Sequence, residues 1–121
     1  MAYIEGFLVP VPEGKKDAYL KMARDTAPLF LDLGASRIVE CWGDDVKRGK
    51  QTDFFRAVDA EEGENVVFSW IEYPDKAARD EAYRKMETDE RFVEPPEMPF
   101  DGKRMIFSGF APMFDTAGEL D

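Results

Sequence analysis

The sequence predicts an α+β protein of the ferredoxin-like class, a sandwich in which two helices cover one face of an antiparallel sheet. Three observations predict it. The segments follow the order β-α-β-β-α-β, which is the split βαβ arrangement. The strand segments are rich in β-branched and aromatic residues. Each helix segment has apolar residues along one side only, as expected for helices packed on one face of a sheet. We expect one domain over residues 1–121.

The first strand is expected from Tyr3 to about Val9, where strict alternation meets Pro10 and Pro12. A helical period follows, with apolar or small residues at spacings of three and four: Ala18, Met22, Ala23, Thr26, Phe30 and Leu33. Pro28 falls inside this helix and is expected to kink it or to separate its last turn. Gly34 is a suitable stop.

The second strand is expected over Ser36 to Trp42, and the strongest strand of the chain over Asn65 to Tyr73. Between them lies a polar excursion, residues 44–64, with a short strand-like piece from Phe54 to Val58. The excursion is too long for a simple hairpin. We therefore expect it to act as a lid over the barrel or as a dimer arm.

Pro74 ends the third strand, and Asp75 is a suitable N-cap for a helix that reaches about Asp89. Its apolar stripe is thin and consists of Ala78, Ala82, Tyr83 and Met86. A loop from Glu94 to Arg104 contains the turn signal Asp101-Gly102. The last strand is expected over Lys103 to Phe110, and residues 111–121 form a C-terminal tail.

The composition narrows the function classes. With 16 Lys and Arg against 26 Asp and Glu, the formal net charge is -10. Nucleic acids and anionic membranes are bound largely through Lys and Arg, so neither is expected as a partner. No apolar run is long enough for a membrane span, and the N-terminal segment lacks the basic stretch of a signal peptide. A soluble cytoplasmic protein is expected.

The chain has no His and one Cys. Without His it lacks the commonest general base, the usual haem ligand and the commonest transition-metal ligand, so no cofactor and no metal are predicted. Asp44 and Asp45 would suit a hard cation, but no loop has the ligand spacing of an EF-hand. Cys41 is expected in the core beneath the helices, as a small apolar residue and not as a nucleophile.

Alternate residues of a strand point to opposite faces of the sheet, which divides the strand residues into two sets. One set is mostly aliphatic and suits packing under helices: Ile4, Gly6, Leu8, Val39, Cys41, Val67, Ile71 and Ile106. The other is aromatic with carboxylates: Tyr3, Glu5, Phe7, Glu40, Trp42, Phe68, Trp70, Glu72 and Phe107. A monomer would expose this second set to water. The pattern therefore predicts a homodimer whose two sheets face each other around a two-fold axis.

Several blocks of the chain resemble the YbaA-like family of small bacterial proteins: "GFLVPVP", "KKDAY", "APLF", "RIVECW", "TDF", "VVFSWIEYP" and "MPFDGKRMI". That family is labelled a domain of unknown function and belongs to the dimeric α+β barrel superfamily. The resemblance covers Tyr3 to about Phe110. It implies the ferredoxin-like fold and a homodimeric barrel, and it implies no activity.

The wider superfamily includes antibiotic-biosynthesis-type and haem-degrading monooxygenases, muconolactone-isomerase-like enzymes and stress-responsive barrel proteins. In many of them the substrate lies in the cavity beside the helix-free face. Oxygenase and haem-degrading members often use a His, which this chain lacks. The absence of His argues most strongly against a haem-degrading enzyme, and less strongly against a cofactor-free oxygenase.

The candidate catalytic residues are Glu40, Glu5 and Glu72, because a carboxylate against aromatic walls loses hydration and can then act as a general acid or base. The alternative is that these residues are paired with Arg across the interface and are purely structural. Five further residues are candidates for ligand binding: Trp42, Trp70, Phe7, Phe68 and Arg104.

Two functional hypotheses remain open. The first is an uncharacterised homodimeric barrel that binds a small organic molecule in an aromatic and acidic cavity. The alternative is a cofactor-independent, monooxygenase-like or isomerase-like enzyme that acts on a small cyclic or carbonyl compound. The sequence does not decide whether the protein is an enzyme.

Overall fold

The structure is a computed structural model that describes residues 2–92 and 98–118. Its four strands form one antiparallel sheet in the order β2-β3-β1-β4. The strands are β1 (Tyr3–Pro12), β2 (Arg37–Trp42), β3 (Glu64–Tyr73) and β4 (Ile106–Phe110). The helices are α1 (Lys16–Asp32), α2 (Phe54–Ala57) and α3 (Lys76–Met86), with 3₁₀ turns η1 (Glu13–Lys15) and η2 (Glu90–Phe92). This is the predicted ferredoxin-like α+β fold.

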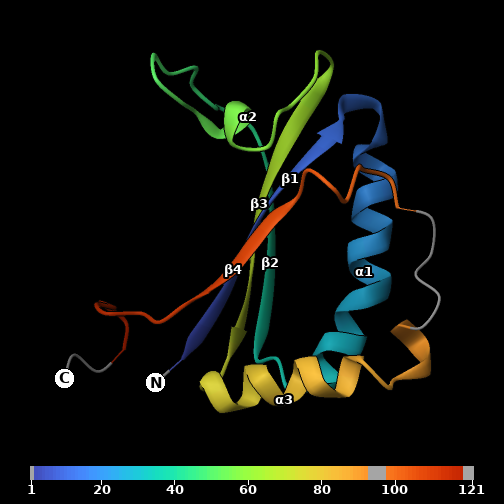
Figure 1. Cartoon of the computed structure of the whole chain (residues 1–121), viewed down its shortest axis with the longest axis vertical. Helices are drawn as coiled ribbons and strands as arrows, with labels where there is room; N and C mark the ends of the chain where they lie inside the picture. The colour runs from blue at the N-terminus through green and yellow to red at the C-terminus, as the bar shows by residue number, and fades with distance from the viewer. Residues whose placement is uncertain (1, 93–97, 119–121) are drawn as a thin grey trace.

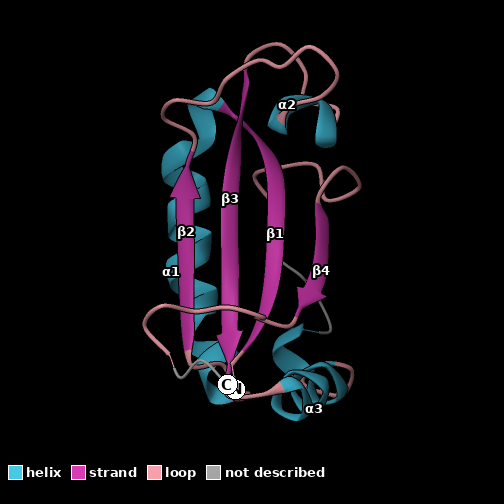
Figure 2. Cartoon of the chain, turned by 90° about the vertical axis from the view of Figure 1, so that its left-hand side faces the viewer, coloured by secondary structure: helices cyan, strands magenta, loops and turns pink. Residues whose placement is uncertain are grey.

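Helix α1 lies along one face of the sheet, and α3 crosses the lower end of the sheet and extends toward the same side (Figure 1). The short helix α2 and the segment that follows β4 lie on the other side. Figure 2 looks onto this second side, with the strands in front of α1. We call this side of the sheet the helix-free face, after the two long helices that it lacks.

Strand β1 is longer than predicted, because it continues through Pro10 to Pro12. Its pairing with β4 ends at Leu8, while its pairing with β3 continues to Pro12. Beyond Leu8 one edge of β1 is therefore free, and a proline, which has no N–H to donate, is tolerated at an edge.

Strand β4 is shorter than predicted, because residues before it form a turn around Asp101. The side chain of Asp101 accepts from the N–H of Lys103 at 3.0 Å, and its carbonyl accepts from the N–H of Arg104 at 3.2 Å. The predicted turn is therefore present, and it takes up the start of the predicted strand. Residues 94–97 of the predicted loop and 119–121 of the predicted tail lie outside the described residues.

The prediction of a strand-like piece over residues 54–58 was wrong, since this segment contains helix α2. Asp53 caps the helix by accepting from the N–H of Arg56 at 2.8 Å, and its other oxygen accepts from the N–H of Gly49 at 3.1 Å. Such an N-cap satisfies donors that a helix start leaves free. The helix packs Phe55, with the neighbouring Val58, over one end of the helix-free face.

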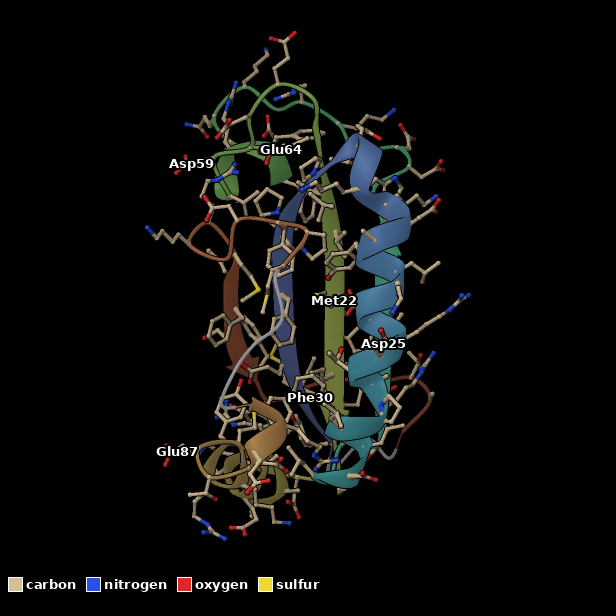
Figure 3. All side chains as sticks on the ribbon, turned by 90° about the vertical axis from the view of Figure 1, so that its right-hand side faces the viewer. Met22, Asp25, Phe30, Asp59, Glu64 and Glu87 are labelled. Carbon is tan, nitrogen blue, oxygen red and sulfur yellow. The ribbon has the colours of Figure 1, made fainter. Side chains whose placement is uncertain are left out.

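Helix α1 runs without interruption through Pro28, and α3 begins as predicted after Asp75, whose side chain accepts from the N–H of Ala78 at 2.8 Å. Figure 3 looks onto α1, where Met22 and Phe30 lie on its sheet-facing side. Between the sheet and the helices the fully buried apolar residues form two clusters: Leu33, Ala35, Ile71, Tyr73 and Ala82, and Val9, Val11, Tyr19 and Val67.

The predicted face of three strands was wrong, although the alternation within each strand was right. Directly opposite residues of paired strands share a face. Leu8 lies opposite Phe68, and Cys41 also lies opposite Phe68, so all three share one face. The strands β1, β2 and β4 are thus turned relative to the prediction, and β3 is as predicted.

The correction moves two groups of residues. The helix side holds residues that were expected on the other face: Tyr3, Glu5, Phe7, Glu40, Trp42 and Phe107. The helix-free face holds residues that were expected under the helices: Ile4, Gly6, Leu8, Val39, Cys41 and Ile106. In particular, Cys41 is an exposed thiol and not a core residue.

Candidate functional site

The carboxylate of Glu5 is buried between the sheet and α3. Arg79 of α3 donates from Nη1 to Glu5 Oε1 at 2.8 Å, with the two side chains 15% and 2% exposed. The guanidinium also donates from Nη2 to the Tyr3 hydroxyl at 3.3 Å and from Nε to Asp80 at 2.9 Å. A buried carboxylate needs such a partner, because an isolated charge in the interior costs several kcal/mol (order of magnitude).

Three tyrosines surround this ion pair. The Arg79 guanidinium lies over the rings of Tyr3 and Tyr83, at 4.8 and 5.1 Å from the ring centroids. Burial, together with the nearby Glu5 carboxylate, raises the pKa of Tyr83 and of Tyr73. The Tyr73 hydroxyl is buried and has no hydrogen-bond partner within the described residues. All these groups are packed in the helix-side layer, and Arg79 holds the Glu5 carboxylate in place.

Glu40 makes a second helix-side contact, at the sheet edge formed by β2. The hydroxyl of Tyr19, a buried residue of α1, donates to Glu40 Oε1 at 2.8 Å. Loss of hydration raises the pKa of Glu40, although the hydrogen bonds from Tyr19 and Ser69 oppose that shift. The residue as a whole stays open to solvent at this edge. Glu40 is therefore a hydrogen-bonded edge carboxylate and not part of the helix-free face.

Glu72 is the one of the three predicted carboxylates that lies on the helix-free face. It accepts from Trp70 Nε1 at 2.9 Å, and Arg37 Nη1 lies 3.5 Å from the same oxygen. Because Glu5 and Glu40 lie on the opposite side of the sheet, the structure does not bring the three carboxylates together. It does bring Phe68, Trp70 and Glu72 together, as predicted for β3.

Around β3 the helix-free face is apolar and exposed. Phe68 is 48% exposed and Phe110 is 60% exposed, and both flank the small residues Gly6 and Ser108 in the middle of the sheet. Gly6 lies opposite Ser108 on one side and opposite Trp70 on the other, and the ring of Phe110 reaches toward it. The result is a hollow with a small-residue floor and aromatic walls.

Two shallow grooves occupy this hollow. One has a volume of about 250 Å³, and its lining includes Gly6, Leu8, Phe54, Phe68, Ile106 and Phe110. The other has a volume of about 470 Å³, and its lining includes Ile4, Gly6, Phe68, Trp70, Phe110 and Pro112. Helix α2 closes one end, where the ring of Phe54 lies 6.0 Å from that of Phe68. Both grooves are concave and apolar, which is the usual character of a site for an organic ligand.

Of the other predicted ligand-binding residues, Phe7 lines the smaller groove, while Trp42 and Arg104 lie elsewhere. Phe7 stacks on Phe107 at 5.8 Å on the helix side, and Trp42 packs there beside Tyr19, with Lys16 5.6 Å above its ring. Arg104 lies at the far end of the sheet, where Figure 3 labels its partner Glu64. Its guanidinium makes two hydrogen bonds to Glu64, of 2.6 and 2.8 Å.

A further groove of about 450 Å³ lies beside α1, on the opposite side of the molecule, with Ala18, Met22, Met98 and Pro99 in its lining. Its charged residues are Lys15, Lys21 and Asp25, of which Lys21 pairs with Asp25 at 2.7 Å. Within residues 2–92 and 98–118 no three carboxylates or thiols are placed to share a metal ion. In the same residues no helix combines the length and the apolar character of a bilayer span.

Sequence reasoning missed three residues that shape these sites. Arg79 and Tyr19 come from helices, and the partners that they bind lie 74 and 21 residues away along the chain. The signal for Tyr19 was present, since it falls on the same helical stripe as Met22 and Phe30. Gly6 was assigned to the helix side, and only the strand register shows that it forms the floor of the hollow.

Comparison with known proteins agrees with this fold. Over 116 residues the chain is 60% identical to the uncharacterized protein YbaA of Escherichia coli strain K12, which covers 95% of this chain and 99% of that protein. The YbaA protein of Shigella flexneri matches to the same extent.

Two solved structures show the same fold at low sequence identity. One is an uncharacterized NIPSNAP domain protein from Burkholderia xenovorans, with a TM-score of 0.51, 17% identity, and coverage of 91% of this chain and 93% of that chain. The other is a dimeric ferredoxin-like protein from an uncultured marine organism, with a TM-score of 0.50, 11% identity, and coverage of 91% and 92%. The family model named "Protein of unknown function (DUF1428)" matches residues 2–102, so the chain belongs to the DUF1428 family.

Proposed function

We propose that this protein is a homodimer whose subunits pack their helix-free faces together, and that the hollow between them binds a small apolar organic molecule. The observation that carries the proposal is the apolar, exposed face around Gly6 and Ser108, walled by Phe68, Phe110 and Ile106. Soluble monomers rarely expose a continuous apolar patch of this kind. A two-fold axis lets one such patch cover another.

The dimeric state of the ferredoxin-like marine protein supports this arrangement, since that protein shares the fold. Two packed sheets lie roughly 10 Å apart, a gap that large inward side chains fill. Gly6 and Ser108 have no such side chain to contribute. A space therefore remains over them when Phe68 and Phe110 meet a second sheet.

The chemistry of the lining defines the ligand class. The grooves present aromatic and aliphatic carbon, and Ser108 adds a polar residue to the lining of the smaller one. Glu72 at the rim is already bonded to Trp70 and lies near Arg37. A neutral, flat, largely apolar molecule fits this environment, because a charged one would lose hydration without gaining a partner.

The enzyme hypothesis is less well supported by this geometry. Glu5 is held by Arg79 and Glu40 by Tyr19, both on the other side of the sheet. Of the three candidate carboxylates, Glu72 is the one on the face that holds the hollow, and it is not part of the lining of either groove. Binding, which needs no acid or base, is therefore the function that the site supports best.

The dimer is tested by sedimentation velocity at micromolar concentration. We expect a dimer for the wild type and a monomer for Phe110→Glu, which places a charge in the aromatic wall of the apolar hollow. The matched control is Leu31→Glu, because Leu31 is a similarly exposed apolar residue on α1. A monomeric wild type, or an unaffected Phe110→Glu dimer, would overturn the proposal.

Ligand binding is tested with N-phenyl-1-naphthylamine, a neutral aromatic dye that fluoresces in apolar surroundings. An added Cβ at Gly6 would make an ordinary contact of 3.5 Å with the ring of Phe110. Because this ring is 60% exposed and can turn aside, Gly6→Val is expected to fold and to fill the hollow. We expect the variant to bind the dye at least roughly tenfold more weakly, and Gly14→Val, in an open turn, to bind it normally. Equal binding by all three proteins would refute the proposed ligand site.

A further inference from the structure

The segment that follows β4 stands away from its own subunit. Figure 1 shows residues 111–118 on the helix-free side of the sheet, directed away from the helices, and Figure 2 shows them crossing in front of the strands. Met113 is 98% exposed and Phe114 is 69% exposed. Their own chain covers neither of them.

The segment nevertheless has a definite shape. Ala111 precedes Pro112, and both the fixed φ of proline and the restriction on the residue before it favour an extended chain that leaves the sheet. Beyond Phe114 the chain closes a turn around Asp115, whose side chain accepts from the N–H groups of Ala117 at 2.8 Å and Gly118 at 3.2 Å. The two apolar side chains are thus carried at the tip of a formed structure.

Exposure of two neighbouring large apolar side chains is unfavourable when a surface is at hand that could bury them. The groove of about 470 Å³ that begins at the base of the segment is apolar as well, with Ile4, Phe68 and Trp70 in its lining. The segment is directed away from this groove in its own subunit, because Ala111 and Pro112 form one edge of the groove and lead the chain outward.

We propose that residues 111–118 form an arm that packs Met113 and Phe114 against the second subunit and closes the hollow of that subunit. The inference rests on the proposed homodimer. In a dimer of facing sheets, the second subunit occupies the space in front of the helix-free face, and the arm already lies in that space. Contact between the arm and the second subunit follows from its position.

With the arm in place, residues of both subunits form each ligand site. One subunit supplies the floor at Gly6 and the walls, and the other supplies the apolar cover. Removal of the arm side chains should therefore weaken dimerisation and ligand binding together. The stability of an isolated subunit should not change, because both side chains are exposed there.

The first test is the double variant Met113→Ser/Phe114→Ser, compared with the matched control Leu20→Ser/Leu31→Ser on the exposed side of α1. We expect the dimer dissociation constant, from sedimentation equilibrium, to rise at least roughly tenfold in the arm variant, as is usual when large apolar anchors are removed. The affinity for N-phenyl-1-naphthylamine should fall with it. The control should match the wild type in both.

The second test locates the arm directly. In a Cys41→Ser background, Phe114→Cys is labelled with benzophenone maleimide and irradiated. Cross-linking between subunits, seen as a covalent dimer with the label joined to helix-free-face residues, is the expected result. Cross-linking within one subunit only would overturn the arm. A dimeric wild type whose dissociation constant is unchanged in the arm variant would also overturn the arm, but it would leave the proposed function intact. A monomeric wild type would overturn both the arm and the proposed function.

Discussion

Arg79 Nη1 lies 2.8 Å from Glu5 Oε1, and this ion pair ties helix α3 to the central strand β1 through the buried layer of the protein. Both side chains are almost closed to solvent, so removal of either charge leaves the other buried without this partner. It also explains why Glu5 points toward the helices, although it lies in an aromatic alternation that suggested the opposite face.

Loss of the guanidinium should destabilise the protein strongly. We expect Arg79→Met to lower the free energy of unfolding by about 3 kcal/mol, since it leaves a buried carboxylate unpaired. Urea denaturation followed by circular dichroism measures the change. The double variant Glu5→Gln/Arg79→Met should recover part of the loss, because it buries no unpaired charge. A single variant within about 0.5 kcal/mol of the wild type would contradict the structural importance of the pair.

Gly109 should tolerate no side chain. An added Cβ would come within 2.8 Å of Tyr3 Cε2 and 2.9 Å of Arg79 Nη1, and Arg79 is held in place by Glu5. We expect Gly109→Ala to cost about 1–3 kcal/mol, as overpacked sites do. Gly102→Ala is the matched control, because an added Cβ there meets nothing within 4 Å. Equal thermal stability of the two variants would show that Tyr3 and Arg79 move aside at little cost.

The edge carboxylate Glu40 should give a distinct pH dependence. Loss of hydration raises its pKa above the ordinary value of 4.5, so the folded state holds the proton more tightly than the unfolded state does. Its contribution to stability is then full below pH 4.5 and declines as the pH rises through the folded pKa. We expect Glu40→Gln to remove this decline, so that the free energy of unfolding of the variant increases relative to that of the wild type as the pH rises from 4.5 to 7. Urea unfolding across this range measures the difference, and a constant difference would contradict it.

The contribution of Glu64 to stability should depend on pH in the opposite direction. Two hydrogen bonds from Arg104 hold the pKa of this carboxyl below its ordinary value of 4.5. Its contribution is therefore present above pH 4.5 and lost as the pH falls through the folded pKa. We expect Glu64→Gln to be less stable than the wild type by about 1–2 kcal/mol at pH 7, with a smaller difference at pH 3. A difference that grows toward low pH would contradict the assignment.

The sequence predicted the order of the elements, and it placed β2, β3 and the start of α3 to within a residue. These predictions depended on local signals: the β-branched and aromatic run before Tyr73, and the side chain of Asp75 as an N-cap. The same reasoning failed at residues 54–58, which were expected to be strand-like, because the Asp53 cap favoured a helix.

The candidate site was predicted in part. Phe68, Trp70 and Glu72 share the helix-free face as expected, while Glu5 and Glu40 do not. Side-chain type was a poor guide, because the aromatic residues Phe7 and Trp42 serve the helix-side layer and the small residue Gly6 forms the floor of the hollow.

The sequence by itself determined which residues alternate, which segments are helical and that a large apolar surface exists beyond what two helices can cover. Only the tertiary structure decided which of the two alternating sets each strand turns toward the helices. The physical reason is that alternation divides the residues of a strand into two sets but does not show which set faces the helices. Which set faces the helices depends on partners distant in the chain, such as Arg79 for Glu5 and Tyr19 for Glu40. It also depends on the strand register, which sets Leu8 opposite Phe68.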